Sequence, residues 1–138
     1  MAEHKTFKAR VLTPEGEVFS GELIQLSTRT QVGEIGVLAN HAPVMARLRP
    51  AELRLHISEG EVRRYAQGEG WLEVFANRAT ALVQEAIPPE DLDAADLKER
   101  IADAEQRLSE ADEGSAAEDI AQRDKERAEK FLELAEGQ

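Results

Sequence analysis

Histidine is the side chain best suited to proton transfer and metal binding near neutral pH, and this chain of 138 residues has three of them, His4, His41 and His56. A metal site would need a second histidine or a group of carboxylates at ligand spacing, and His41 has neither. The chain contains no cysteine, which excludes a thiolate metal site, a cysteine nucleophile and a disulfide. We therefore expect no metal and no covalent catalytic centre.

The motifs that carry nucleophilic or phosphate chemistry are also missing. Ser20-Gly21 and Ser27-Thr28 lack the context of a nucleophile elbow. Gly68-Glu69-Gly70 is a turn and not a dinucleotide fingerprint, because no strand–helix–strand unit surrounds it. No glycine-rich loop ends in Gly-Lys-Ser/Thr. The sequence predicts no catalytic residue and no cofactor.

The most strongly patterned stretch is residues 32–43, which read VGEIGVLANHAP. Gly33 and Gly36 permit positive φ angles and a close approach of the backbone, and the proline at the end fixes its own φ. We expect a chain that bends sharply twice and presents one carboxylate, Glu34, and one imidazole, His41. These elements make a shaped surface loop.

The elements that would position this loop are strands. Before Pro88 the apolar residues follow a period of two, as in Phe7, Ala9 and Val11 and again in Leu53, Leu55 and Ile57. Turn signals separate these runs at roughly eight to twelve residues, the spacing of a small antiparallel β-sandwich. We predict such a domain over residues 1–88. The large aromatic side chains are expected in its core: Phe19, Trp71 and Phe75.

From Asp91 onward the apolar period changes to about 3.5, which indicates helices with a narrow seam. The first seam comprises Leu97, Ile101, Ala104, Leu108 and Ala111, and the second comprises Ala117, Ile120, Ala121, Ala128, Phe131 and Ala135. Asp93 is a suitable N-cap, Gly114 suits a helix end, and Ser115 to Glu118 have capping-box spacing. We predict an antiparallel helical hairpin over residues 89–138, and hence an α+β fold, β first and then α.

Alanine-rich seams bury little apolar area, so the hairpin is expected to be marginally stable. An element of this kind could detach and act as a switch, or it could stay packed. The sequence leaves both alternatives open.

Charge is distributed unevenly between the two predicted domains. Residues 1–89 carry 11 acidic and 10 basic side chains, whereas residues 90–138 carry 17 and 7, and the whole chain has a formal net charge of −11. Such an acidic chain is repelled by phosphate backbones and anionic lipid, so nucleic-acid binding is disfavoured. No stretch approaches the ~20 apolar residues that span a bilayer, so no direct lipid insertion is expected.

The charged helices allow two interpretations. Pairs at i,i+4 spacing would simply support a solvated face: Asp96/Arg100, Asp103/Arg107 and Glu126/Lys130. Alternatively, the only basic cluster of the acidic half could dock on an acidic partner surface: Arg123, Lys125, Arg127 and Lys130.

Two segments carry a resemblance to a known family. Gly33 to Leu38 with His41-Ala42-Pro43, and the strand segment 67–74, QGEGWLEV, resemble the epsilon subunit of the bacterial F-type ATP synthase. The resemblance implies a non-catalytic subunit of the rotating central stalk, on the cytoplasmic face of the plasma membrane. It implies that the β-domain binds the gamma subunit and lies against the ring of c subunits. It also implies a hairpin that can extend along gamma toward the alpha/beta catalytic head and oppose ATP hydrolysis.

The same resemblance assigns the patterned loop to the c-ring and gamma interface. Glu34 and His41 match the part that faces the polar loops of the c ring. The full set of interface residues that it implies is Gly33, Glu34, Ile35, Gly36, Asn40, His41 and Pro43.

Some family members bind ATP at the start of the hairpin through a Leu/Ile-Asp-x-x-Arg-Ala pattern. Here the stretch reads Leu92-Asp93-Ala94-Ala95-Asp96-Leu97, so Asp93 matches but Asp96 stands where the arginine is expected. A carboxylate repels a phosphate instead of pairing with it. This substitution argues against ATP binding.

Two other functions compete with this interpretation. A regulator that inserts an acidic hairpin into the secondary channel of RNA polymerase would use Asp112-Glu113 at the tip to hold a metal, although the domain order is reversed for that class. A ligand-binding sandwich or a small hydrolase would need convergent polar groups, which the turns do not offer.

Overall fold

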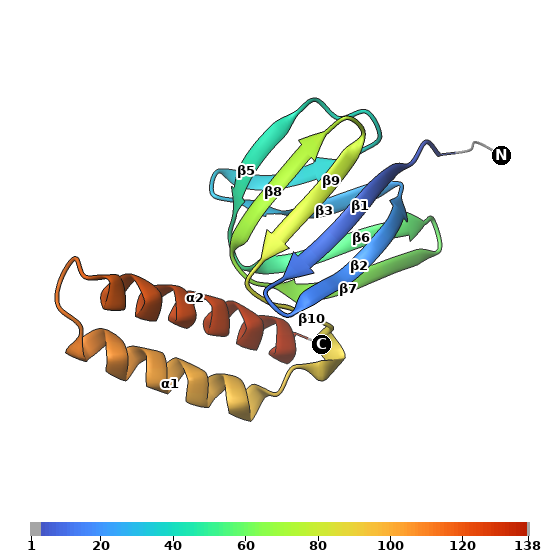
Figure 1. Ribbon diagram of the computed structural model, residues 1–138. Helices are drawn as coiled ribbons and strands as arrows, with labels where there is room; N and C mark the ends of the chain where they lie inside the picture. The colour runs from blue at the N-terminus through green and yellow to red at the C-terminus, as the bar shows by residue number, and fades with distance from the viewer. Residues whose placement is uncertain (1–3, 138) are drawn as a thin grey trace. The chain divides into compact units, whose positions relative to one another are not determined.

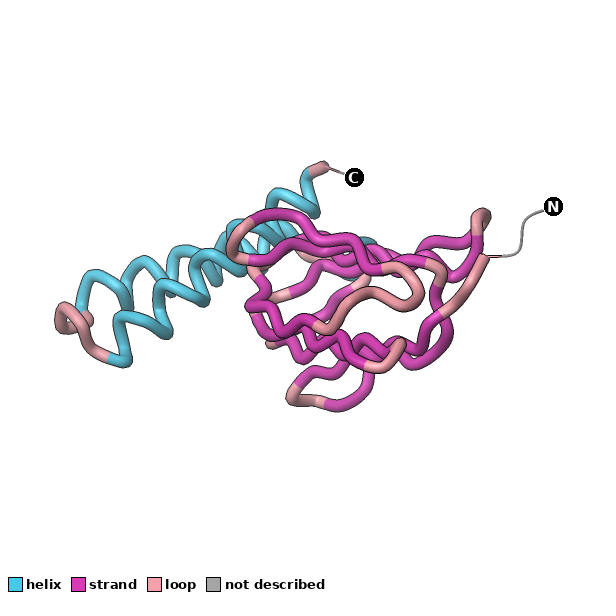
Figure 2. The backbone as a smooth tube through the Cα atoms, turned by 90° about the horizontal axis from the view of Figure 1, so that it is seen from above, coloured by secondary structure: helices cyan, strands magenta, loops and turns pink. Residues whose placement is uncertain are grey.

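The computed structural model describes residues 4–137, so residues 1–3 and 138 of the two predicted domains lie outside the described part. The chain divides into two compact units, Met1–Ile87 and Pro88–Gln138, one residue from the predicted boundary. The strands all lie in the first unit and the α-helices in the second (Figure 2). The predicted α+β class, β first and then α, is confirmed.

Alternating apolar and polar residues form the strands because successive side chains point to opposite faces. In β1 (Phe7–Thr13) the apolar Phe7, Ala9 and Val11 are buried, while Lys8 and Arg10 are exposed. The remaining strands are β2 (Gly16–Leu23), β3 (Gln25–Thr30), β4 (Gly33–Val37), β5 (Val44–Leu48), β6 (Ala51–Ser58), β7 (Glu61–Gln67), β8 (Gly70–Phe75), β9 (Arg78–Val83) and β10 (Ala86–Ile87).

The strands form a sandwich of two layers (Figure 1). One layer has the order β10-β7-β6-β3, with β4 paired to β3, and the other has the order β5-β8-β9-β1-β2. A single register pair, Thr30 with Leu48, joins β3 to β5 and so connects the layers. All described pairings are antiparallel except that of β1 with β9.

The aromatic side chains of the core are Phe7, Phe19 and Tyr65, which differ from the predicted set. Phe19 is buried, as expected. The prediction is wrong for Trp71 and Phe75, which are 46% and 64% exposed. On β8 these two residues alternate with the buried Leu72 and Val74, so the strand period turns both aromatic rings outward. Leucine, valine and alanine from both layers fill the interior instead.

The second unit is the predicted helical hairpin. A short 3₁₀ turn, η1 (Pro89–Asp91), precedes α1 (Ala94–Glu110), and a five-residue connection leads to α2 (Ala116–Glu136). Asp93 caps α1 by accepting hydrogen bonds from the backbone N–H groups of Ala95 and Asp96, at 2.9 and 3.2 Å. Figure 1 shows the two helices running antiparallel to each other.

The connection between the helices differs slightly from an ordinary capping box. The hydroxyl of Ser115 accepts from the N–H of Glu118 at 3.2 Å, as predicted. The Glu118 carboxylate, however, accepts from the N–H of Gly114 at 3.0 Å, one residue before the cap. Gly114 has φ +78°, a left-handed conformation that glycine adopts without strain.

The predicted seams are confirmed only in part. Leu97, Ala104, Ala121 and Ala128 are buried together with Phe131. The stripe prediction is wrong at the start of α2, where Ala117 is exposed and Ile120 is 52% exposed. Half of the buried residues of the described hairpin are therefore alanines, and the others are Leu97, Arg127 and Phe131.

Gly70, the first residue of β8, lies very close to the backbone of a paired strand. A Cβ atom on Gly70 would lie 1.9 Å from the carbonyl oxygen of Leu82, and that oxygen belongs to the backbone of a paired strand. We expect Gly70→Ala to destabilise the sandwich by about 2 kcal/mol or more, as other overpacked sites do. Urea unfolding followed by the fluorescence of Trp71, the single tryptophan, measures this unit.

The matched control is Gly60→Ala, because a Cβ atom there meets nothing within 4 Å. That variant should stay within about 0.5 kcal/mol of the parent chain. Equal unfolding midpoints for the two variants would contradict the close approach at Gly70.

Candidate functional site

The β3–β4 hairpin displays Glu34 at the surface. Gln31 and Val32 form the turn, and Val32 is 98% exposed. The Thr30 hydroxyl donates to the carbonyl of Gly33 at 2.9 Å and accepts from the N–H of Val32 at 3.2 Å, so one side chain ties the turn from both sides. Glu34 follows in β4, opposite Arg29 in the ladder, with its side chain exposed.

Only one of the two glycines in this loop makes a bend. Gly33 has φ +134°, outside the range that other residues readily adopt, and it turns the chain into β4. Gly36 lies within β4, paired with Ser27, and makes no bend. The second bend occurs at Asn40, which has φ +64°. Asparagine is among the few residue types that tolerate this conformation.

A compact turn after β4 holds His41. The N–H of His41 donates to the carbonyl of Leu38 at 3.2 Å, and its ring Nδ1 lies 2.7 Å from the carbonyl oxygen of Ala42. The tautomer with a proton on Nδ1 makes this contact a hydrogen bond and leaves Nε2 as an acceptor. The half-buried ring is therefore held in one orientation.

Asn77, a residue far away in the sequence, fixes this turn in place. Its side-chain oxygen accepts from the N–H of Asn40 at 2.7 Å, and its side-chain nitrogen donates to the carbonyl of Thr6 at 3.1 Å. Asn77 can do so because it lies in the tight β8–β9 turn, where Ala76 and Asn77 both have positive φ. Sequence reasoning recognised this turn but not its link to the loop.

Glu34 and His41 do not converge on a common point. Glu34 is the second residue of β4, whereas His41 lies beyond its other end, so the strand separates them. Within residues 4–137 no cluster of three or more potential metal ligands occurs. Glu34 and His41 therefore offer two separate polar contacts, one near the start of β4 and one beyond its end.

An apolar stripe is the feature that the sequence analysis missed. Met45 of β5, Trp71 and Phe75 of β8, and Leu82 of β9 lie on the outer face of their layer and are between 46% and 64% exposed. Trp71 is the register partner of Leu82 on one side and of Arg47 on the other. The Arg47 guanidinium lies 5.5 Å from the centre of the Trp71 ring, a cation–π contact. We call these four apolar residues the apolar stripe.

A basic groove continues the same outer face over β1. Its volume is about 280 Å³, and its basic rim comprises Lys8, Arg10 and Arg78. Lys8 and Arg78 are register partners on parallel strands, an arrangement that places like charges side by side. Arg10 donates to Glu17 at 3.0 Å. The outer face therefore combines exposed apolar area with cations.

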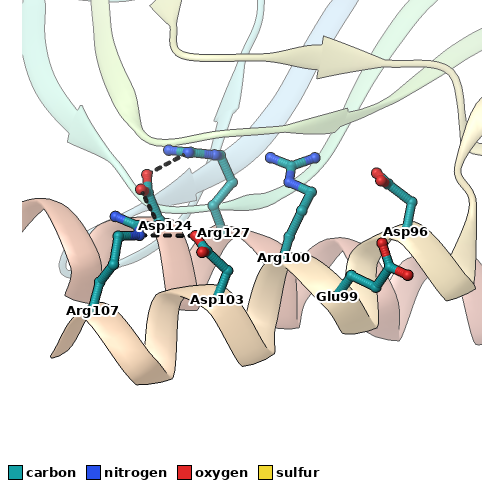
Figure 3. Close-up of a pocket in the computed structure, with 7 residues that line it drawn as sticks. All are labelled: Asp96, Glu99, Arg100, Asp103, Arg107, Asp124 and Arg127. Carbon is teal, nitrogen blue, oxygen red and sulfur yellow. Dashed lines mark hydrogen bonds and ion pairs between the residues drawn. The ribbon is translucent and has the colours of Figure 1, made fainter. Parts of the chain in front are cut away.

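In the hairpin, charged side chains of both helices line a groove of about 440 Å³ (Figure 3). Arg107 of α1 donates to Asp103 of the same helix and to Asp124 of α2, both at 2.9 Å. Asp124 also accepts from Arg127 at 2.7 Å. The hydrogen bonds to Asp103 and Asp124 raise the pKa of Arg107 further above its ordinary value, so it stays charged at every relevant pH.

This geometry corrects the predicted docking cluster. Arg123 is exposed and forms no ion pair within residues 4–137, so it remains available. Arg127 does not: its side chain is only 9% exposed and bonds to Asp124. Lys125 lies 4.0 Å from Glu105 across the hairpin, and Lys130 lies 3.0 Å from Glu133. The i,i+4 pair of Asp103 with Arg107 is confirmed.

Asp93 and Asp96, the two acidic residues of the stretch that was compared with an ATP-binding pattern, have different surroundings from each other in the structure. The Asp93 carboxylate serves as the N-cap of α1. Asp96 lies on the wall of the hairpin groove next to Glu99 and on the same wall as Arg100 (Figure 3).

Residues 6–89 match the family described as "ATP synthase, Delta/Epsilon chain, beta-sandwich domain". The chain belongs to this family. It is 38% identical to the ATP synthase epsilon chain of Persephonella marina, over 94% of this chain and 96% of the relative. It is 35% identical to the epsilon chain of Rubrobacter xylanophilus, over 88% of this chain and 86% of the relative. The resemblance inferred from the loop is thereby confirmed.

Solved structures share the fold. A chain of the Euglena gracilis mitochondrial ATP synthase, in a structure containing OSCP, F1 and the c-ring, superposes with a TM-score of 0.71 at 21% identity, covering 99% of this chain and 83% of that one. A chain from the Tetrahymena thermophila mitochondrial ATP synthase central stalk and c-ring gives 0.62 at 13% identity, covering 97% and 99%. At these identities the likeness concerns the fold.

The epsilon-chain family assignment decides between the functions considered from the sequence. The chain is an epsilon subunit of an F-type ATP synthase, an accessory subunit that is not an enzyme by itself. It is a peripheral part of a membrane-bound complex. No described helix is long and apolar enough to cross a bilayer. The polymerase-channel regulator is therefore the wrong alternative.

Proposed function

We propose that this epsilon chain is a rotor subunit of the central stalk that couples the gamma subunit to the c ring at the cytoplasmic face of the bacterial plasma membrane. The observation that carries the proposal is that the sandwich exposes two surfaces of different chemistry, and we assign a docking role to each. One is the polar β3–β4 hairpin with Glu34 and the adjoining His41 turn, and the other is the apolar stripe with its cations. Two surfaces of different chemistry suit two partners.

The apolar stripe is the surface that we assign to gamma. Large apolar side chains left exposed on a sheet face mark a protein interaction site, and aromatic residues dominate binding energy at such sites. The cations beside it, Arg47 and Arg78, would add orientation through complementary charges. The related structures are of an OSCP, F1 and c-ring assembly and of a central stalk with its c-ring, which agrees with partners of this kind.

The β3–β4 hairpin is the surface that we assign to the c ring. Its conformation is fixed by backbone pairing and by the Thr30 hydroxyl, so Glu34 is presented without a large loss of entropy on binding. The turn with Asn40, His41 and Pro43, anchored to Asn77, supplies a second polar contact. Small polar loops of a partner need defined donors and acceptors of this kind.

Charge reversal tests the ring contact. We expect Glu34→Lys to lower ATP-driven proton pumping by about twofold or more in membranes that carry the assembled enzyme, because a contact between charges reverses its sign. Glu15→Lys, in the exposed β1–β2 turn, makes the same charge change elsewhere on the sandwich and should leave pumping unchanged. Normal pumping with Glu34→Lys would argue against the assignment.

Truncation of the exposed tryptophan tests the gamma contact. We expect Trp71→Ala to weaken binding to purified gamma by about tenfold or more, the effect of removing an aromatic anchor. The sandwich should stay folded, since the ring is 46% exposed and contributes little to the core. Ile120→Ala removes a side chain of similar exposure from the hairpin and is the control. Unchanged affinity of Trp71→Ala for gamma would remove the stripe from this interface.

We also propose that the hairpin opposes ATP hydrolysis by docking on the alpha/beta head when extended, and that it does so without sensing ATP. Asp93 already caps a helix, and Asp96 adds a carboxylate to a groove that contains three other acids. Isothermal titration of ATP into the full chain should therefore give no binding heat up to millimolar nucleotide. Binding at millimolar concentration or tighter would show that the groove accepts phosphate in spite of Asp96.

A further inference from the structure

The strongest unassigned feature of the hairpin is a chain of four alternating charges that crosses from one helix to the other. In order these are Asp103, Arg107, Asp124 and Arg127, linked by hydrogen bonds of 2.9, 2.9 and 2.7 Å (Figure 3). Asp124 is the central member, because its two carboxylate oxygens accept from arginines of both helices. Removing this one side chain would break the hydrogen bond from Arg107, which is the link between α1 and α2 in the chain of charges.

These four side chains differ in their exposure to water. In the link between the helices the side chain of Asp124 is 29% exposed and that of Arg107 is 41% exposed, whereas Arg127, which bonds to Asp124 within α2, is 9% exposed. Charges that are partly removed from water interact more strongly and are screened less than exposed ones. Asp103, in contrast, is 68% exposed and bonds within its own helix, so its contribution is expected to be small.

The apolar seam gives the hairpin little other support near Asp124. The closest fully buried apolar residues on either side in α2 are Ala121 and Ala128, and the fully buried apolar residues of α1 are Leu97 and Ala104. Alanine contributes little apolar area, so the ion pairs carry a larger share of the attraction between the helices. Most helical stability in proteins comes from tertiary packing, so parting the two helices would also weaken their own hydrogen bonds.

We propose that these four residues form an ionic clasp that closes the hairpin and masks two of its cations. While it is closed, Arg107 and Arg127 are bound to Asp124 and face no partner. An acidic surface of a partner protein competes with Asp124 for the same guanidinium groups, and it gains both cations only by opening the clasp. The proposal deepens the regulatory role given above and rests on it only for the consequence of opening.

Amide hydrogen exchange of the full chain measures opening directly. We expect Asp124→Asn to speed exchange of the amides of α1 and α2 by about tenfold or more, as expected when a partly buried pair loses one partner. Amides of the sandwich serve as an internal standard and should not change. Asp103→Asn is the matched control, removing the exposed member, and should change exchange by less than about threefold.

Salt provides a readout that loss of packing would not affect. Raising NaCl from 0.1 to 1 M shortens the screening length from about 10 to about 3 Å, so the parent hairpin should exchange faster. In Asp124→Asn that salt dependence should largely disappear. Unchanged exchange in Asp124→Asn, or a parent hairpin that is insensitive to salt, would overturn the clasp.

ATP hydrolysis by the assembled enzyme tests the consequence separately. If opening frees the arginines for the alpha/beta head, Asp124→Asn should lower hydrolysis by about twofold or more relative to Asp103→Asn. Faster exchange with unchanged hydrolysis would leave the clasp intact and refute the regulatory role. The two failures are therefore distinguishable.

Discussion

The site of the sandwich depends on the fully buried amide of Gln67. Its side-chain oxygen accepts from the hydroxyl of Thr28 on β3 at 2.6 Å, and its side-chain nitrogen donates to the carbonyl of Arg49 at 2.9 Å. β3 pairs with β6 over its first half and reaches β5 only at Thr30, so its backbone must leave one layer for the other. The amide supplies hydrogen bonds where regular pairing is interrupted, and buried polar groups need such partners. The β3–β4 hairpin and Glu34 are positioned by this corner.

The alternation of side chains along the strands determines what each of the two proposed docking surfaces exposes. In β8 every second residue points inward to the core, which leaves Trp71 and Phe75 on the outer face, 46% and 64% exposed. In β4 the same period exposes Glu34. One face is therefore apolar and the edge strand polar, and neither contains groups arranged for a reaction. This division is suited to an accessory subunit that holds two partners.

Much of the fold could be predicted from the sequence because local patterns dictate it. The alternation in Phe7 to Val11, the turn residues and the helix cap at Asp93 all act over a few residues. The same alternation, applied to Leu72 and Val74, predicts Trp71 on the outer face, whereas the general tendency of aromatic rings to be buried predicts it in the core. The structure follows the alternation. Of the two bends predicted for residues 32–43, one lies at Gly33 and the other at Asn40, while Gly36 stays extended because glycine permits a bend without requiring one.

The parts that could not be predicted depend on residues far apart in the sequence. Asn77 reaches Asn40 only because two turns meet at one end of the sandwich. Asp124 lies on α2 between apolar residues of the helix seam, and its partner Arg107 lies 17 residues away on the other helix. A pattern within one helix shows which face a residue occupies, but the register between two helices decides which charges meet. For this reason the sequence predicts Arg127 as a docking residue, whereas in the structure its guanidinium donates a hydrogen bond to Asp124.

The two units differ in the kind of attraction that they use, and this difference has a consequence for a rotor subunit. Contacts through the apolar stripe gain from removing apolar area from water, and salt does not weaken that gain. The clasp consists of charges, and salt or an acidic competitor weakens it. A change in ionic strength is therefore expected to act more strongly on the clasp than on the apolar part of the gamma contact. In the proposed rotor subunit, the apolar stripe would hold the sandwich to gamma under conditions that open the hairpin.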